Sequence, residues 1–305
     1  MQNIYILGET TYDIIFKDNQ PFEAKVGGSQ LNTAISLGRL HLPVSFISHI
    51  GDDAVGEIST SFIKENGIDD SYIIRHEGAS RIALAFLNKN NDATYSFFKA
   101  ENSSPFQFPE IKENDIILYG SSFAMRTDIR EELVSFLSHA KTSNAILLYD
   151  PNYRKGNTSS EKERLRIVKE NIQLATIVKG SDDDFHNIFG LSDASEVWEH
   201  VRKLDVDCLF YTANKKGVNV YWEKSSLFLS VPVIEPVSTI GAGDNFNAGL
   251  IFSLFTRRDE KQKLSSLTSE DWSQMAQVST RFAQQVCLSY DNYISTQFAK
   301  QLTDN

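Results

Sequence analysis

The sequence lacks the features that mark several classes of protein. It holds only two cysteines, Cys208 and Cys287, both inside apolar runs, so we expect buried reduced thiols rather than a disulfide framework. No apolar run approaches the length of a membrane span. The six histidines form no HExxH or Cys/His cluster for zinc. The N-terminus enters an apolar run without a basic leader, so we expect a cytoplasmic protein.

Positive charge is also scarce. The 305 residues carry a formal net charge of −10, which argues against a nucleic-acid partner. The same charge repels anionic ligands at long range, so any site for such a ligand must be a local arrangement of backbone amides and metal. The length and the hydrophobic content of 41% suffice for one large α/β domain or two ordinary ones.

Strand-like and helix-like segments alternate along much of the chain. Their alternation from about residue 110 onward predicts βαβ units around a parallel sheet, and so an α/β fold. The strand-like runs cover 3–8, 44–51, 81–87, 115–120, 144–150, 175–180, 207–212 and 217–222. The helix-like stretches cover 31–40, 57–67, 128–141, 161–174 and 193–204.

Two segments interrupt this alternation, at 9–26 and about 71–104. Both are turn-rich and locally alternate with a period of two, and NKNND at 88–92 suggests a hairpin turn. We expect these segments to form a small separate sheet over an active site, within a single domain spanning 1–305. An exposed edge of this sheet could pair with a second copy, and one hypothesis for the oligomeric state is therefore a homodimer.

The most informative segment is STIGAGDNFNAGL at 238–250. Its small residues let the backbone approach a ligand closely, and the free amides of a following helix favour an anion. Asp244 in the same turn is placed to take a proton from an attacking hydroxyl. The sixth position is Phe246 rather than Gly, so this is not a dinucleotide fingerprint, and no GK[ST] follows to make a P-loop. A Gly-rich loop capped by Asp244, without chemistry, remains the alternative.

The same segment resembles the C-terminal signature DTTGAGDAFxAG of the ribokinase-like (PfkB) carbohydrate kinases. Other motifs of that family follow in the expected order and span residues 8–250. They are GETTYD (8–13), GGSQLNTA (27–34), GDDAVG (51–56), DPNYR (150–154), which is frequent in fructokinases, and KGSDDD (179–184).

This resemblance implies a three-layer α/β/α fold with a mostly parallel central sheet and a small β-sheet lid. It implies phosphoryl transfer from ATP with Mg²⁺ to a hydroxyl of a small sugar. Asp244 would be the catalytic base, with an anion hole formed by the amides of Gly241, Ala242 and Gly243. The implied sugar-binding residues are Asp13, Gly27, Gly28, Asn32, Asn152 and Arg154.

The resemblance also implies a nucleotide site. Its implied ATP-binding residues are Lys179, Ser181, Thr212, Asn214, Gly217 and Thr239, and the adenine would lie between 212–222 and 272–292. Asp184, or the neighbouring Asp183, would hold Mg²⁺ through water. An acidic helix start at Asp184, a solvated Arg154 and an Asp53 that merely fixes its turn remain alternatives.

Four positions depart from the family pattern. Ser238 replaces an Asp that in many members helps to hold a monovalent cation, so potassium activation does not follow from the sequence. Ile240 stands where Thr is frequent, and Ser181 replaces the commoner Asn. Asn214 replaces a Gly, and we expect it to keep the turn because Asn tolerates the left-handed conformation.

The DPNYR motif makes fructose the first choice of substrate. A 2-keto-3-deoxygluconate kinase is the close alternative, because the same motif occurs there and Arg154 could meet the carboxylate of the sugar acid. A nucleoside kinase is less favoured. A catalytically silent sugar- or nucleotide-binding protein on the same fold is the alternative from another class, and the intact GAGD motif argues against it.

Overall fold

A large central sheet forms the body of the protein in the computed structural model, which describes residues 2–87, 93–98, 104–154, 161–257 and 264–304. The strands run parallel from β11 to β5, and β12 and β13 join antiparallel at one edge. In sheet order they are β13 (Ser225–Leu229), β12 (Val218–Trp222), β11 (Cys208–Thr212), β10 (Ile177–Ser181), β9 (Ile146–Asp150), β8 (Ile116–Gly120), β1 (Ile4–Leu7), β4 (Val44–Gly51) and β5 (Ile73–His76).

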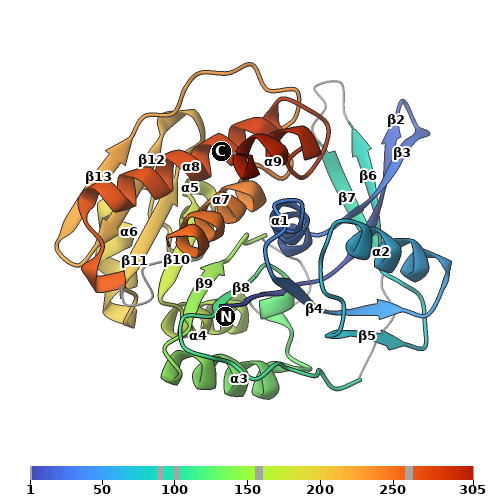
Figure 1. The fold of residues 1–305 in the computed structure, drawn as a ribbon, viewed down its shortest axis with the longest axis horizontal. Helices are drawn as coiled ribbons and strands as arrows, with labels where there is room; N and C mark the ends of the chain where they lie inside the picture. The colour runs from blue at the N-terminus through green and yellow to red at the C-terminus, as the bar shows by residue number, and fades with distance from the viewer. Residues whose placement is uncertain (1, 88–92, 99–103, 155–160, 258–263, 305) are drawn as a thin grey trace.

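Helices cover both faces of this sheet (Figure 1). One hydrophobic cluster lies under α1 (Ser29–Gly38), α2 (Ala54–Glu65), α7 (Ala242–Thr256), α8 (Ser269–Cys287) and α9 (Thr296–Thr303). A second cluster lies under α3 (Arg130–Thr142), α4 (Glu161–Leu174), α5 (Asp182–Phe189) and α6 (Ala194–Val201). Short 3₁₀ turns occur at Phe123–Met125, Arg202–Leu204, Asn214–Lys216 and Leu264–Ser266. The predicted three-layer α/β/α fold is therefore confirmed.

Local sequence signals account for many of these elements. The helix predicted at 161–174 is α4, and the strand predicted at 44–51 is β4. Asp53 caps α2 by accepting from the amide of Gly56 at 2.8 Å and also binds the hydroxyl of Ser80 at 2.6 Å. Of the two roles considered for Asp53, fixing the turn is the one that these contacts support.

The expectation of parallel strands is wrong at the C-terminal edge of the sheet. Strand β12 follows β11 after a short turn at 213–217, which is too short for a crossover, so β12 and then β13 pair antiparallel. Helix α7 therefore follows an antiparallel edge rather than a final βαβ unit.

A second sheet of four strands stands out from the body (Figure 1). Its order is β3 (Gln20–Gly27), β2 (Thr11–Lys17), β6 (Ile82–Leu87) and β7 (Ala93–Phe98). The antiparallel pairing of β6 with β7 agrees with the predicted hairpin, whose turn at 88–92 lies outside the described residues. Residues 73–76 were expected in this sheet but form β5 of the large sheet, because α2 returns the chain to the edge beside β4 as a βαβ unit.

Other expectations concern burial and hydrophobic length. Both cysteines are free and buried, one on β11 and one at the end of α8. Among the described residues, no helix combines the length and the hydropathy needed to cross a bilayer.

Candidate active site

The glycine-rich segment before α7 makes a tight turn against the loop at 288–292. Gly241 caps α7 with a φ of 79°, and a Cβ placed there would lie 2.7 Å from the carbonyl oxygen of Asn292. Both the positive φ and the close approach require glycine. The turn therefore fixes where the first residues of α7, including Asp244, stand.

Free amides gather at this helix start. Among the hydrogen bonds of the described residues, the amides of Gly241, Gly243 and Asp244 have no acceptor. The amide of Ala242 differs from the prediction, because it donates to the carbonyl of Thr239 at 3.3 Å. Unpaired amides at a helix N-terminus, together with the helix dipole, favour an anion.

Asp244 is held by α1. Its carboxylate accepts from the hydroxyl of Ser29 at 2.7 Å and from the side-chain amide of Asn32 at 2.8 Å, and its carbonyl accepts from Thr33 at 2.8 Å. Burial raises the pKa of Asp244 to about 6, although the hydrogen bonds from Asn32 and Ser29 oppose this increase. A carboxylate with this pKa is suited to act as a base near neutral pH.

Ser29 links Asp244 to the loop after β9. The side-chain amide of Asn152 donates to the hydroxyl of Ser29 at 2.9 Å, so the serine proton must point to Asp244. Asn152 adopts a φ of 36° to reach this position. Ser29 was not among the residues predicted for the site, although it lies inside GGSQLN between Gly28 and Asn32.

A buried ion pair lies beside the glycine turn. The ammonium of Lys179 is 3.0 Å from the carboxylate of Asp150, which also accepts from the side chain of Asn247 at 2.6 Å. A Cβ on Gly243 would lie 3.0 Å from the Lys179 ammonium, so the predicted ATP-binding lysine reaches the free amides. Burial alone would lower the pKa of Lys179, but the charges of Asp150 and Asp184 and the hydrogen bond to Asp150 together outweigh it, and the pKa is raised. Neither Asp150 nor Asn247 was among the predicted site residues, although Asp150 opens the DPNYR motif.

Asp184 serves as a helix cap. It accepts from the amide of Tyr153 at 2.7 Å and from the amide and hydroxyl of Ser181 at 2.8 and 2.6 Å, which completes a capping box at α5. The alternative of an acidic helix start is therefore what the structure shows. The Asp184 carboxylate also joins the end of β10 to the loop after β9. Among the described residues, no three acidic, histidine or cysteine side chains gather to hold a metal.

Four of the six predicted sugar residues, Asp13, Gly27, Gly28 and Asn32, lie where β2, β3 and α1 join. The Asp13 carboxylate lies against Gly27, where a Cβ would be 2.5 Å from it, and burial raises the pKa of Asp13. Gly28 has a φ of 133°, and a Cβ there would strike the carbonyl of Glu9. The Oδ1 atom of Asn32 is buried without a partner among the described residues, so it is available to a substrate hydroxyl.

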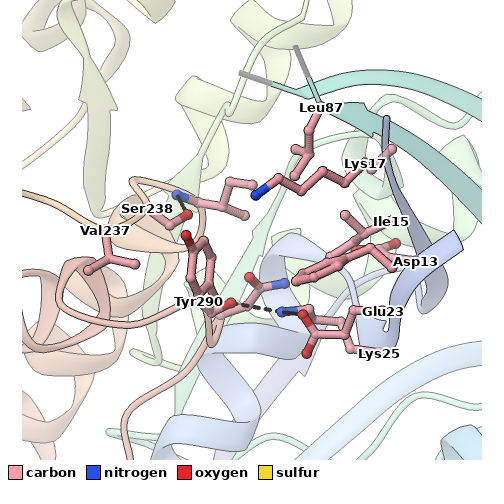
Figure 2. Close-up of a pocket in the computed structure, with 13 residues that line it drawn as sticks. Asp13, Ile15, Lys17, Glu23, Lys25, Leu87, Val237, Ser238 and Tyr290 are labelled. Atoms are coloured by element: carbon pink, nitrogen blue, oxygen red, sulfur yellow. Dashed lines mark hydrogen bonds and ion pairs between the residues drawn. The ribbon is translucent and has the colours of Figure 1, made fainter. Parts of the chain in front are cut away.

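An open pocket lies between the small sheet and the C-terminal loops, as Figure 2 shows. Asp13, Lys17 and Lys25 reach into it from β2 and β3, while Val237, Ser238 and Tyr290 form the facing wall. The hydroxyl of Ser238 accepts from the amide of Ile240 at 3.2 Å. The complete lining is Asp13, Ile15, Lys17, Phe22, Glu23, Lys25, Ala85, Leu87, Val237, Ser238, Ile240, Tyr290 and Asn292.

The remaining predicted residues are less central. Asn214 has a φ of 50° and keeps the turn before Gly217, whose φ is 115°, so the expected tolerance of Asn is confirmed. The hydroxyl of Thr212 donates to the carbonyl of Gly180 at 3.3 Å. Arg154 is exposed, and the contacts described for it run through its carbonyl to Arg164 rather than to the site.

An α/β fold in which a carboxylate of raised pKa lies beside the free amides of a helix start fits a phosphoryl-transfer enzyme. The chain matches the pfkB family carbohydrate kinase model over residues 1–297 and belongs to that family. It is accordingly a phosphotransferase acting on sugars. The resemblance stated from the motifs is thereby confirmed.

Individual relatives are distant but match over nearly the whole chain. A fructokinase of Vibrio alginolyticus is 21% identical over 278 residues, which cover 90% of this chain and 91% of that protein. The crystal structure of a Vibrio cholerae fructokinase with fructose, ADP and calcium has a TM-score of 0.84 at 18% identity, covering 97% and 96% of the two chains. The aminoimidazole riboside kinase of Salmonella enterica has a TM-score of 0.80 at 19% identity, covering 99% of each.

Proposed function

We propose that this protein is an ATP-dependent kinase that phosphorylates a hydroxyl of fructose, with Asp244 as the base. The observation that carries the proposal is the position of Asp244. Its carboxylate has a raised pKa and lies in the same helical turn as the free amides of Gly241 and Gly243. The fructose assignment rests on the DPNYR motif and on relatives named fructokinase.

The proposed reaction follows from these positions. The Asp244 carboxylate takes the proton of the attacking sugar hydroxyl, and the sugar oxygen bonds to the γ-phosphorus of ATP while the bond to ADP breaks. The free amides and the Lys179 ammonium face the charge on the transferring phosphoryl group. Asp13 and the unpaired Oδ1 of Asn32 accept other sugar hydroxyls.

The acidic groups at the ends of β9 and β10 fit Mg²⁺. This ion takes oxygen ligands, keeps several waters and is usually held by one or two carboxylates together with phosphates, so a three-carboxylate cluster is not required. Asp184 would hold it through water, and the ion would supply neutralisation of phosphate charge. We assign Thr212, Asn214, Gly217 and Thr239 to the nucleotide side of the site.

The test is ADP release with ATP and Mg²⁺ across a panel of sugars, run on wild type and Asp244→Asn. The panel includes fructose, 2-keto-3-deoxygluconate and aminoimidazole riboside. Turnover with fructose that falls by about 10²–10⁴-fold in the variant supports the proposal. Preferred turnover of the sugar acid moves the assignment to that substrate. Folded protein that binds ATP but turns over none of them contradicts the proposal and favours the silent binding protein.

We further propose that the small sheet is a lid and that its outer face pairs with a second copy. Alternation places Asp13 and Ile15 toward the pocket and Phe16 and Phe86 on the other face, where their rings stack 4.9 Å apart. Phe98 on the same outer face is 57% exposed. A sheet face that meets only water is normally polar. Sedimentation of wild type and Phe98→Asp tests this, and a monomeric wild type at micromolar concentration contradicts it.

A further inference from the structure

Lys25 connects the small sheet to the C-terminal loop across the mouth of the pocket. Its ammonium donates to the carbonyl of Tyr290 at 2.7 Å, over a separation of 265 residues, and lies 3.5 Å from the Glu23 carboxylate (Figure 2). The side chain is only 9% exposed. Because the donor is a charged ammonium, this hydrogen bond is a charge-assisted contact.

The loop that Lys25 holds supports the anion site. The carbonyl of Asn292, two residues after Tyr290, accepts from the side chain of Asn245 at 2.8 Å and would lie 2.7 Å from a Cβ placed on Gly241. At the other end of the loop, the carbonyl of Cys287 accepts from the amide of Val237 at 2.8 Å. The loop thus contacts the glycine turn, and the end of α8 just before the loop contacts the segment that leads into this turn, so we expect a shift of the loop to move the free amides.

Lys25 also faces the sugar site. It is the cross-strand partner of Asp13 in the pairing of β2 with β3. Burial raises the pKa of Asp13, and the charge of Lys25 opposes that increase. One ammonium therefore acts both on the carboxylate assigned to the sugar and on the loop behind the phosphate site.

We propose that Lys25 is a positioning residue. It tethers the 288–292 loop to β3 and so fixes the position of the anion-hole amides relative to the sugar site. The proposal rests on the phosphoryl-transfer function proposed above. Lys25 contacts neither Gly241 nor Asp244 in the described hydrogen bonds and acts through the carbonyl of Tyr290. A neutral side chain here would leave that carbonyl without its charged donor.

The experiment compares Lys25→Ala with Lys64→Ala, a matched change at an exposed lysine of α2 that pairs with Asp70. We expect Lys25→Ala to lower kcat by about 10- to 100-fold, as loss of a charged hydrogen bond predicts. The KM values for ATP and sugar should change less than about threefold, because the loss falls on the transition state. Lys64→Ala should stay within about twofold of wild type.

Two further readouts separate positioning from simple destabilisation. Methylammonium, which fits the space left by Lys25→Ala and donates hydrogen bonds, should restore part of kcat, whereas tetramethylammonium should not. Hydrogen exchange without substrates should be faster in Lys25→Ala than in wild type at the hydrogen-bonded amides around the loop, which are those of Val237, Ala242 and Ser289. If Lys25→Ala does not fold, Lys25→Met, which keeps the aliphatic stem, is judged by the same criteria.

The outcomes are decisive in both directions. Unchanged exchange with kcat within about twofold of wild type overturns the proposal. A loss confined to the KM of the sugar also overturns it and makes Lys25 a sugar ligand. If wild type phosphorylates no sugar, the proposed function fails separately, and the exchange measurement still decides whether Lys25 tethers the loop.

Discussion

Replacing Asp244 by Asn should lower turnover by about 10²–10⁴-fold and at the same time stabilise the fold. The raised pKa of Asp244 means that the native state disfavours its charge. The difference between the ordinary value of 3.8 and about 6 corresponds to about 3 kcal/mol at about 1.4 kcal/mol per pH unit. Asp244 is only partly buried, so solvent screening reduces this figure and we expect about 1–3 kcal/mol at neutral pH.

The new amide also finds partners. Its oxygen can still accept from Ser29, and Asn32 can turn its side chain so that the unpaired Oδ1 accepts from the new amide nitrogen. No buried donor is therefore left facing another donor. The substitution removes a disfavoured charge without adding an unpaired polar group.

The pH dependence has a definite sign. Between pH 3.8 and about 6 the native state binds a proton at Asp244 that the unfolded chain has lost, so the penalty grows as pH rises. Below pH 3.8 both states are protonated and the penalty vanishes. The Tm advantage of Asp244→Asn should accordingly be absent at low pH, grow up to about pH 6 and stay constant above it.

Thermal unfolding followed from pH 4 to pH 8 measures this effect. We expect Tm to rise by roughly 2–5 °C at pH 7.5. Asp53→Asn is the matched control, for which we expect the opposite change in stability. Burial alone would raise the pKa of Asp53, but hydrogen bonds from Ser80 and Gly56 lower it. That variant should lose stability above pH 4 and recover relative to wild type in acid. A less stable Asp244→Asn at pH 7.5, or a Tm difference independent of pH, would refute the reasoning.

Three further predictions concern the same site. Ser29→Ala removes a hydrogen bond that lowers the pKa of Asp244, so the acid limb of the kcat/KM profile should move from about pH 6 to higher pH, and an unmoved limb contradicts the assignment. Gly241→Ala places a Cβ on a residue with positive φ and against the carbonyl of Asn292. We expect kcat to fall by at least about tenfold while a thermal scan still shows a folded protein. Lys179→Met leaves Asp150 buried without its cation, so calorimetry should show a loss of roughly 3–5 kcal/mol, and wild-type stability would mean that the pair does not matter.

The local pattern of apolar and turn-forming residues determined much of the fold. The helix at 161–174 and the strand at 44–51 are read directly from hydrophobic period and flanking signals, because each reflects one face buried against the body. The left-handed turn at Asn214 and the start of α7 after Gly241 follow from the conformational range of Asn and Gly. The order of the motifs along the sequence was sufficient to identify the family.

Pairings between distant segments were decided only by the tertiary structure. The sequence of β5 resembles that of the segments that form the small sheet. The strand nevertheless joins the large sheet, because α2 returns the chain to the edge beside β4. Ser29 bonds Asp244 across 215 residues and Lys25 bonds Tyr290 across 265, and no local period encodes either contact. A sequence states which side chains can donate or accept, whereas packing of α1 on α7 and of β3 on the C-terminal loop decides which of them meet.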